Sequence, residues 1–262
     1  MDLSRYSMEG RTVIITGGSG GIGRGCARAF AQAGANVVIA SVPADSIPPV
    51  LEEVESLGAQ ALGVAANVTV AEQVDDVVKQ TLDRFGRIDV LLNIAGGTYS
   101  RNAEMPQFER APLLDIDETD FMTTYENNVK SAFLCARAVV PHMKALGKGV
   151  IVNTGSTLGS RPIGKASGEM SAYGASKGAV HTLTVHMASQ WGPEVRVNCI
   201  APGVIDTFRA PGGTVRPEVA AAASRVSVGR VGEADDIGGV ALFLASDAAS
   251  FINGVVIPVD GG

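Results

Sequence analysis

Short apolar runs alternating with segments of helical periodicity constrain the fold of this chain more than any other feature. The runs that read as strands are TVIIT (12–16), NVVIA (36–40), AQALGVAA (59–66), DVLLN (89–93), GVIVNTG (149–155), VRVNCI (195–200) and GVVIPVDGG (254–262). Uniformly apolar strands separated by amphipathic helices indicate parallel strands that are covered on both faces. The sequence therefore predicts an α/β fold, a doubly wound Rossmann-type sheet of seven parallel strands with helices on both faces.

No repeat, linker or low-complexity tract divides the 262 residues, so we expect a single domain over 1–262. Polar insertions near 97–116, 158–170 and 206–224 interrupt the pattern and are expected to form substrate loops. The net charge of −6, with no run of Lys or Arg, argues against nucleic acid and anionic membranes as partners. No leader-like or membrane-length apolar run is present, which predicts a cytoplasmic protein.

The cysteines and histidines lack the spacing of metal or disulfide sites. Cys26, Cys135 and Cys199 lie in apolar segments without CxxC spacing, which predicts buried thiols in a reducing compartment. The three histidines show no ligand spacing with nearby carboxylates, so no metal is expected. His181 shares a helix face with Tyr173 and Lys177, and we interpret it as a core or surface residue.

The segment TGGSGGIG (16–23) joins the first predicted strand to the first predicted helix. Glycines at this position let the backbone turn sharply and approach a pyrophosphate, and the free N–H groups at the helix start face its negative charge. Because the segment directly follows a buried strand, it predicts a dinucleotide site rather than a flexible connection.

In SAYGASKGAV (171–180), Tyr173 and Lys177 are four residues apart and share one helix face. A phenol has a pKa of about 10, and lowering it to about 7 requires roughly 4 kcal/mol in favour of phenolate. A cation about 4 Å away supplies roughly 1 kcal/mol in bulk water and about 4 kcal/mol at a half-buried site. The pair therefore predicts a general acid/base whose lysine and oxidised cofactor assist it.

One combination of motifs runs in order through the whole chain. Its members are Thr16-Gly17-x-x-x-Gly21-Ile22-Gly23, NIAGG (93–97), NNV (127–129), the set Ser156, Tyr173 and Lys177, APG (201–203) and VDGG (259–262). In this combination the chain resembles the short-chain dehydrogenase/reductase family. The resemblance implies an NAD(P)-dependent oxidoreductase that forms a homodimer or homotetramer, in which helices 117–146 and 171–191 pair and the C-terminal strand region completes the tetramer.

The resemblance also implies the site residues. The expected catalytic residues are Asn128, Ser156, Tyr173 and Lys177, with Thr154 and Ser160 as alternatives to Ser156 and Asn127 as the alternative to Asn128. Ser156 would polarise the reacting oxygen, Asn128 would hold a water that links Lys177 to solvent, and Lys177 would also hold the nicotinamide ribose. The expected cofactor contacts are Gly17, Ser19, Gly20, Gly21, Ile22, Gly23, Ser41, Asn67, Val68, Asn93, Ala95, Gly96, Tyr173, Lys177, Pro202, Gly203, Ile205 and Thr207.

Three positions depart from the family pattern. Ser41 stands where NAD-preferring members usually carry Asp, Asn67 replaces an Asp against the adenine, and Ile94 replaces the second Asn of Asn-Asn-Ala-Gly. Neither an acid nor an arginine stands in Ala40-Ser41-Val42-Pro43, so both NAD and NADP stay open, and the lack of a nearby cation favours NAD. Asn93 is interpreted mainly as a structural residue.

The function predicted from these residues is the interconversion of a secondary alcohol and a ketone. The arginines of the insertions, Arg101, Arg110, Arg161, Arg209 and Arg216, could receive an anionic substrate. One alternative is an enoyl- or dienoyl-CoA-type reductase, against which the intact tyrosine argues. The other is a regulator that binds a dinucleotide without turnover, although such proteins often lose the Tyr or the Lys.

Overall fold

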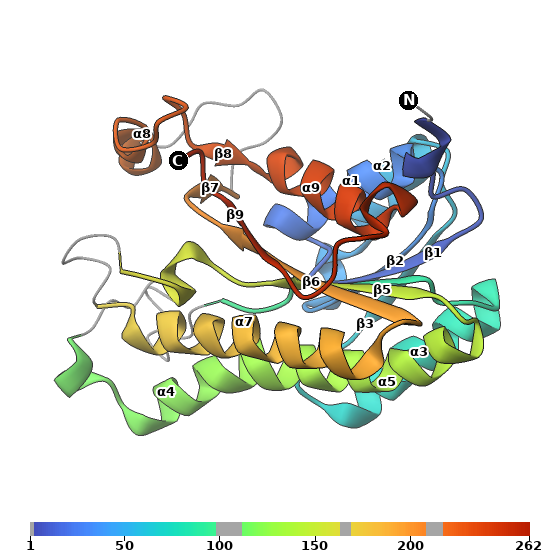
Figure 1. Ribbon diagram of the computed structural model, residues 1–262, viewed down its shortest axis with the longest axis horizontal. Helices are drawn as coiled ribbons and strands as arrows, with labels where there is room; N and C mark the ends of the chain where they lie inside the picture. The colour runs from blue at the N-terminus through green and yellow to red at the C-terminus, as the bar shows by residue number, and fades with distance from the viewer. Residues whose placement is uncertain (1–2, 98–111, 163–168, 208–216) are drawn as a thin grey trace.

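The computed structural model describes residues 3–97, 112–162, 169–207 and 217–262, and it contains one seven-stranded parallel sheet (Figure 1). The strand order is β3-β2-β1-β4-β5-β6-β9, and every pairing is parallel. The strands are β1 (Thr12–Thr16), β2 (Asn36–Ser41), β3 (Ala61–Ala65), β4 (Val90–Asn93), β5 (Gly149–Thr154), β6 (Val195–Pro202) and β9 (Val256–Val259). The predicted doubly wound fold is confirmed, and the strand order reverses between β1 and β4, where such sheets bind ligands.

Helices cover both faces of this sheet (Figure 1). The α1, α2 and α9 helices lie on one face, and α3, α5 and α7 lie on the other. The helices are α1 (Gly21–Gln32), α2 (Pro48–Ser56), α3 (Ala71–Phe85), α4 (Glu118–Tyr125), α5 (Ser131–Ala145), α7 (Ser171–Trp191), α8 (Pro217–Ala223) and α9 (Ala234–Ala245). Shorter turns are η1 (Leu3–Tyr6), η2 (Ala44–Ser46), η3 (Leu113–Asp115), the π-helical η4 (Glu126–Lys130), η5 (Thr157–Gly159) and η6 (Asp247–Ala249). A two-stranded sheet of β7 (Ile205–Asp206) and β8 (Gly232–Glu233) lies beyond β6.

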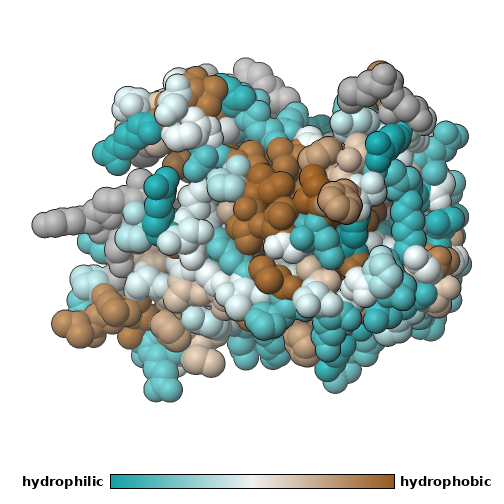
Figure 2. Space-filling model, in the orientation of Figure 1, coloured by the Kyte–Doolittle hydropathy of each residue, from teal (hydrophilic) through white to brown (hydrophobic). Residues whose placement is uncertain are grey.

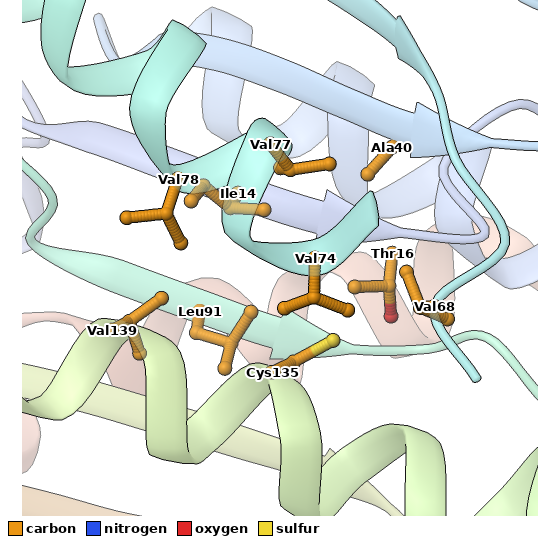
Figure 3. Close-up of a pocket in the computed structure, with 10 residues that line it drawn as sticks. All are labelled: Ile14, Thr16, Ala40, Val68, Val74, Val77, Val78, Leu91, Cys135 and Val139. Atoms are coloured by element: carbon orange, nitrogen blue, oxygen red, sulfur yellow. The ribbon is translucent and has the colours of Figure 1, made fainter. Parts of the chain in front are cut away.

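Alternation along the buried strands builds two apolar layers. In β1, Val13 and Ile15 pack with Phe30 of α1 on one face, while Ile14 packs with Val74 of α3 on the other. Figure 3 shows the second layer, where apolar side chains of β1, β4, α3 and α5 surround a small interior pocket. The pocket is part of the packed core because Thr16 is the one polar residue among the ten that line it.

The α1 and α9 helices pack closely because glycines meet at their crossing. A Cβ on Gly25 would lie 2.5 Å from the backbone carbon of Ala234, and one on Gly238 would lie 2.7 Å from the carbonyl oxygen of Gly25. Any larger side chain at either position would push the helices apart. This contact fixes the start of α1, which follows the glycine-rich turn.

The structure differs from the sequence-based expectation in two places. The helix expected over 117–146 contains the π-turn η4. The α8 helix lies inside 206–224, which was expected to be a loop. Residues 98–111, 163–168 and 208–216 of the three insertions lie outside the described residues, as do Arg101, Arg110, Arg209 and Arg216.

The three cysteines are free and buried, as predicted. Across the described ranges, no helix is both long and apolar enough to cross a bilayer. No group of three or more His, Cys, Asp or Glu side chains within these ranges is arranged to hold a metal ion.

Candidate active site

The loops that follow β1 and β4 are joined at the carboxyl edge of the sheet. The hydroxyl of Thr16 accepts hydrogen bonds from the backbone N–H groups of Ile94 and Ala95, both at 3.1 Å. A Cβ on Gly17 would lie 2.9 Å from the Cα of Ala95. The glycine-rich turn and the segment after β4 therefore lie side by side at the switch point of the sheet, where such folds bind ligands.

The glycine-rich turn is a backbone cradle. Gly17 and Gly21 have φ values of 64° and 46°, which side chains disfavour. A Cβ on Gly23 would overlap the carbonyl oxygen of Gly17, so the helix start lies directly against the turn. Gly20 caps α1 without a side-chain hydrogen bond, which leaves the N–H groups of the first helical turn available to an anion.

Three serine hydroxyls meet at the end of β2. The hydroxyl oxygens of Ser19 and Ser41 are 2.6 Å apart, and Ser46 of η2 donates to Ser19 at 2.8 Å. Arg24, in the first turn of α1, is paired with Glu53 of α2. The place where an acid or a base would select the cofactor is thus lined by neutral hydroxyl groups.

Glycines also bring the turn after β5 against α7. A Cβ on Gly174 would lie 3.0 Å from the carbonyl oxygen of Leu158, and one on Gly178 would lie 2.9 Å from that of Gly159. The small residues that surround Tyr173 and Lys177 therefore let the η5 backbone lie directly on the helix. This approach places Ser156, which precedes η5, beside the face of α7 that carries Tyr173 and Lys177.

Ser156, Tyr173 and Lys177 form one constellation. The Ser156 side chain hydrogen-bonds Tyr173, and the Lys177 ammonium lies 5.6 Å from the centroid of the Tyr173 ring. Lys177 is 3 % exposed, and its Nζ donates to the carbonyl oxygen of Thr154 at 2.8 Å. Of the two predicted alternatives to Ser156, Thr154 contacts Lys177 through its backbone carbonyl and not its side chain, and Ser160 lies farther along the same turn.

The pKa shift of Tyr173 is opposite to the one expected from the sequence. Burial raises the pKa of Tyr173, and the hydrogen bond from Ser156 opposes that rise only in part. Burial also lowers the pKa of Lys177 from 10.5 to about 8. The protein alone therefore favours the protonated phenol, because loss of solvation outweighs the hydrogen bond from Ser156.

Asn128 lies in the π-turn and is 2 % exposed. Its Nδ2 donates to the carbonyl oxygens of Gly97 at 2.8 Å and Thr124 at 2.9 Å and to the hydroxyl of Ser176 at 3.2 Å, while its Oδ1 accepts from Gly97 N–H at 2.9 Å. A π-turn shifts one residue out of the regular helical ladder and often marks a functional site. Here it directs Asn128 between the loop after β4 and α7.

A buried polar chain attaches α7 to the centre of the sheet. Asn93 donates to Asn153 at 2.9 Å, Asn153 donates to Thr184 at 3.0 Å, and Thr184 donates to the carbonyl oxygen of Val180 at 2.8 Å. All three side chains that form it are at most 4 % exposed. A fully buried network of this kind fixes the position of α7 relative to β4 and β5.

The remaining predicted cofactor residues border the same edge. Thr207 packs against Gly21, with its Cβ 3.0 Å from a Cβ built on that glycine, and Gly203 donates its N–H to Val259 at 3.0 Å. Asn67 accepts hydrogen bonds from the N–H and hydroxyl of Thr69, and Val68 turns its side chain into the pocket of Figure 3. Ile22 and Ile205 are half-buried, and Pro202 is buried.

Sequence reasoning did not assign a role to His181, which contacts the Ser156 turn. Its Nε2 lies 3.4 Å from the backbone nitrogen of Ser156. The signal was the shared helix face with Tyr173 and Lys177, but the contact itself depends on how closely η5 approaches α7.

Comparison with known proteins gives a family. Residues 17–262 match the family model described as enoyl-(acyl carrier protein) reductase. A 3-oxoacyl-[acyl-carrier-protein] reductase of Thermotoga maritima is 36 % identical over 97 % of this chain and 98 % of its own length. This chain belongs to the short-chain dehydrogenase/reductase family. The sequence-based assignment is thereby confirmed.

Other members of the family include dehydrogenases that act on hydroxyl groups. The 7alpha-hydroxysteroid dehydrogenase of Escherichia coli is 34 % identical to this chain, over 97 % of this chain and 94 % of its own length. A solved structure of a 7 alpha-hydroxysteroid dehydrogenase with NADH and 7-oxo glycochenodeoxycholic acid has a TM-score of 0.88 at 33 % identity, covering 100 % of this chain and 97 % of the other.

Proposed function

We propose that this protein is an NAD(P)-dependent oxidoreductase that interconverts a secondary alcohol and a ketone. The observation that carries the proposal is the constellation of Ser156, Tyr173 and Lys177 at the carboxyl edge of the sheet, beside the glycine-rich cradle. Perturbed titratable groups in a switch-point crevice are typical of a catalytic site.

The residues present fit a dinucleotide. Gly17 and Gly23 let the turn pack tightly against its neighbours, a Cβ on Gly20 would meet nothing within 4 Å, and the uncapped start of α1 offers N–H groups to a pyrophosphate. The walls of the site would be completed by Ala95, Gly96 and the 202–207 segment. When bound, the nicotinamide supplies hydride chemistry at the carbon of the alcohol or ketone.

The chain's own residues handle the proton at the substrate oxygen. Tyr173 gives the proton to that oxygen in reduction and removes it in oxidation. The Ser156 hydroxyl donates a hydrogen bond to the same oxygen and stabilises the charge that develops there. Lys177, held by Thr154, favours the phenolate form of Tyr173, and Asn128 links α7 to the loop after β4, where it would hold the relay water.

We propose NAD(H) as the preferred cofactor. The hydroxyl groups of Ser19, Ser41 and Ser46 satisfy one another and are uncharged, which suits a ribose hydroxyl better than a doubly negative phosphate. Arg24, which could otherwise neutralise a phosphate, is already paired with Glu53.

Reduction of a conjugated thioester is the second candidate, and the description of the matching family model is the observation that favours it. That reaction adds hydride to a carbon–carbon double bond and does not call for a phenol–serine pair at a carbonyl oxygen. The geometry of Ser156 and Tyr173 therefore ranks carbonyl chemistry first. A non-catalytic dinucleotide sensor has no use for the same pair.

We also propose a homo-oligomer, a dimer or tetramer. Figure 2 shows apolar residues gathered over α9 and β9, and Phe251 and Val255 of the C-terminal segment are exposed. Light scattering of the wild-type protein and of Phe251→Asp tests this, and a monomeric wild type would contradict it. The buried thiols suit a reducing compartment, which we propose to be the cytoplasm.

A substrate screen tests the proposed reaction. Purified protein is mixed with secondary alcohols and NAD or NADP, or with ketones, 7-oxo glycochenodeoxycholic acid and an enoyl-CoA with the reduced cofactors, and nicotinamide absorbance is followed. We expect turnover of an alcohol or ketone, loss of that turnover in Tyr173→Phe, and a higher kcat/KM with NAD. Turnover of the enoyl thioester alone, or unchanged activity in Tyr173→Phe, would contradict the proposal.

A further inference from the structure

The ring of His181 lies under the turn that carries Ser156. Its Nε2 is 3.4 Å from the backbone nitrogen of Ser156, and its Nδ1 is 3.5 Å from the hydroxyl of Ser160. The imidazole therefore reaches both ends of the 156–160 segment. His181 follows Lys177 by one helical turn on α7, so it supports the turn from the same helix that carries the acid/base pair.

Two glycines leave the space that this ring occupies. A Cβ on Gly155 would overlap Nε2 of His181, and a Cβ on Gly159 would lie 2.8 Å from its Cε1. A side chain at either position would displace the ring or the turn. The contact thus depends on three residues from two segments, which distinguishes His181 from a histidine that merely borders the core.

The polarity of the contact selects one form of the imidazole. The Ser156 backbone nitrogen is a donor, so Nε2 must present its lone pair and the ring proton must be on Nδ1. In that form Nδ1–H points at the Ser160 hydroxyl oxygen, which accepts. Protonation would place an Nε2–H against the Ser156 N–H and remove the acceptor.

The surroundings keep the ring neutral. Burial lowers the pKa of His181, and the Lys177 ammonium adds to that effect. Cys199 on β6 also borders this position, because a Cβ on Gly155 would lie 2.9 Å from its Sγ, and burial raises the pKa of that thiol to about 11. None of these neighbours is an anion that would favour an imidazolium.

The backbone held by His181 controls where the Ser156 hydroxyl stands. Ser156 Oγ accepts from the N–H of Leu158 at 3.2 Å and also bonds Tyr173. A shift of the Ser156 nitrogen would move this oxygen relative to the phenol. Small misplacements of a reacting group can lower rates by about a hundredfold.

We propose that His181, as the neutral Nδ1–H tautomer, is a positioning residue that holds Ser156 in register with Tyr173. The proposal rests on the proposed function only for its kinetic consequence. The tautomer and the position of Ser156 are properties of the protein without substrate.

Three variants test it. His181→Leu removes both polar contacts, His181→Gln keeps an acceptor and a donor of similar reach, and His186→Gln is the matched control on the exposed face of α7. With the ketone found in the screen and NADH, we expect kcat to fall about 10- to 100-fold in His181→Leu with KM and NADH affinity within about twofold. His181→Gln should recover to within about fivefold of the wild type, and His186→Gln should match it.

The pH profile and NMR give independent readouts. In the wild type, kcat should fall at pH values below the ordinary histidine pKa of about 6.5, and His181→Gln should lose that fall. Nitrogen-15 spectra should show His181 protonated on Nδ1, and the Ser156 amide resonance should shift in His181→Leu and less in His181→Gln.

An Nε2–H tautomer, or unchanged kcat in a folded His181→Leu protein, would overturn the proposal. If His181→Leu does not fold, the tautomer and the pH profile of His181→Gln decide. If the wild type reduces no ketone, the proposed function fails, while the tautomer and the Ser156 resonance still test the role of His181.

Discussion

Asn128 and Gly97 are joined by two hydrogen bonds, because the Asn128 amide accepts from the Gly97 N–H at 2.9 Å and donates to the Gly97 carbonyl at 2.8 Å. The side-chain amide of Asn128 thus makes the same pair of hydrogen bonds to Gly97 that the backbone of a neighbouring β-strand would make. It ties the segment after β4 to the π-turn between α4 and α5. Asn128, which is proposed for proton relay, therefore also holds the loop after β4 against the π-turn.

Asn128→Ala should lower stability as well as activity. The substitution removes this partner from the half-buried Gly97 and from the buried Thr124 carbonyl, and a buried polar group left unsatisfied costs about 1–3 kcal/mol. We expect the Tm to fall by roughly 5 °C or more. Asn127→Ala is the control because Asn127 bonds Ser131 through its backbone carbonyl, which alanine retains. Equal Tm values for the two variants would show that the hydrogen bonds of the Asn128 side chain do not stabilise the protein.

Tyr173→Phe should bind NADH normally and lose turnover. The substitution removes only the hydroxyl that Ser156 bonds and keeps the ring beside Lys177. We expect kcat to fall by at least about a thousandfold, at the upper part of the range for general acid/base groups together with loss of substrate hydrogen bonding. Fluorescence titration with NADH checks binding, and initial rates check turnover. Measurable wild-type rates in this variant would remove Tyr173 from the mechanism.

Lys177 should destabilise the protein at neutral pH. Its folded pKa of about 8 lies below the ordinary 10.5, so below pH 8 the ammonium is buried at a cost of about 3 kcal/mol. Between pH 8 and 10.5 the unfolded chain holds this proton and the folded chain does not, so stability rises with pH. Between pH 8 and 10.5, the free energy of unfolding of the wild type should therefore rise relative to that of Lys177→Met.

Denaturant unfolding of both proteins from pH 7 to 10.5 measures this difference. Lys144→Met, which removes an exposed lysine at the end of α5, is the matched control. A constant difference between wild type and Lys177→Met across the window would mean that Lys177 keeps an ordinary pKa.

The strands and α7 were predictable from the sequence because each carries a strong local pattern. Uniform apolarity identified β1 and β2, and the expected helix 171–191 coincides with α7. The glycine-rich turn and the Tyr173–Lys177 spacing likewise predicted a site at the carboxyl edge of the sheet, since residues at the carboxyl ends of parallel strands meet at one edge.

The remaining features depend on contacts between distant segments. The π-turn at Asn128 has no sequence period of its own, and the serine cluster requires Ser46 of η2 to reach Ser19. The contact of His181 with Ser156 exists because Gly155 and Gly159 let the turn approach α7. The raised pKa of Tyr173 reflects burial, which the spacing of Tyr and Lys does not encode.

Ser41→Asp should increase the preference for NAD over NADP. A carboxylate at the end of β2 can bond a ribose hydroxyl and repels a 2′-phosphate, whereas the serine hydroxyl does neither strongly. We expect the ratio of kcat/KM values for the two cofactors to rise by about tenfold or more. Ser41→Arg should move the ratio in the opposite direction, and Ser56→Asp, on the exposed end of α2, should leave it unchanged. A ratio that is insensitive to charge at position 41 would place the ribose elsewhere.

Gly23→Ala should weaken dinucleotide binding through the shape of the cradle. A Cβ at this position would overlap the carbonyl oxygen of Gly17, and backbone atoms cannot yield as a flexible side chain can. The turn must therefore move away from α1, which displaces the N–H groups proposed to face the pyrophosphate. We expect the Kd for NADH to rise at least about tenfold.

Gly239→Ala is the control, because a Cβ there meets nothing within 4 Å and the residue lies in α9, where alanine is a better helix former by about 0.5–1 kcal/mol. Calorimetric titration of both variants with NADH, together with their Tm values, separates a local effect on the cradle from general destabilisation. If Gly23→Ala binds NADH as tightly as the wild type, the turn after β1 is not the pyrophosphate site.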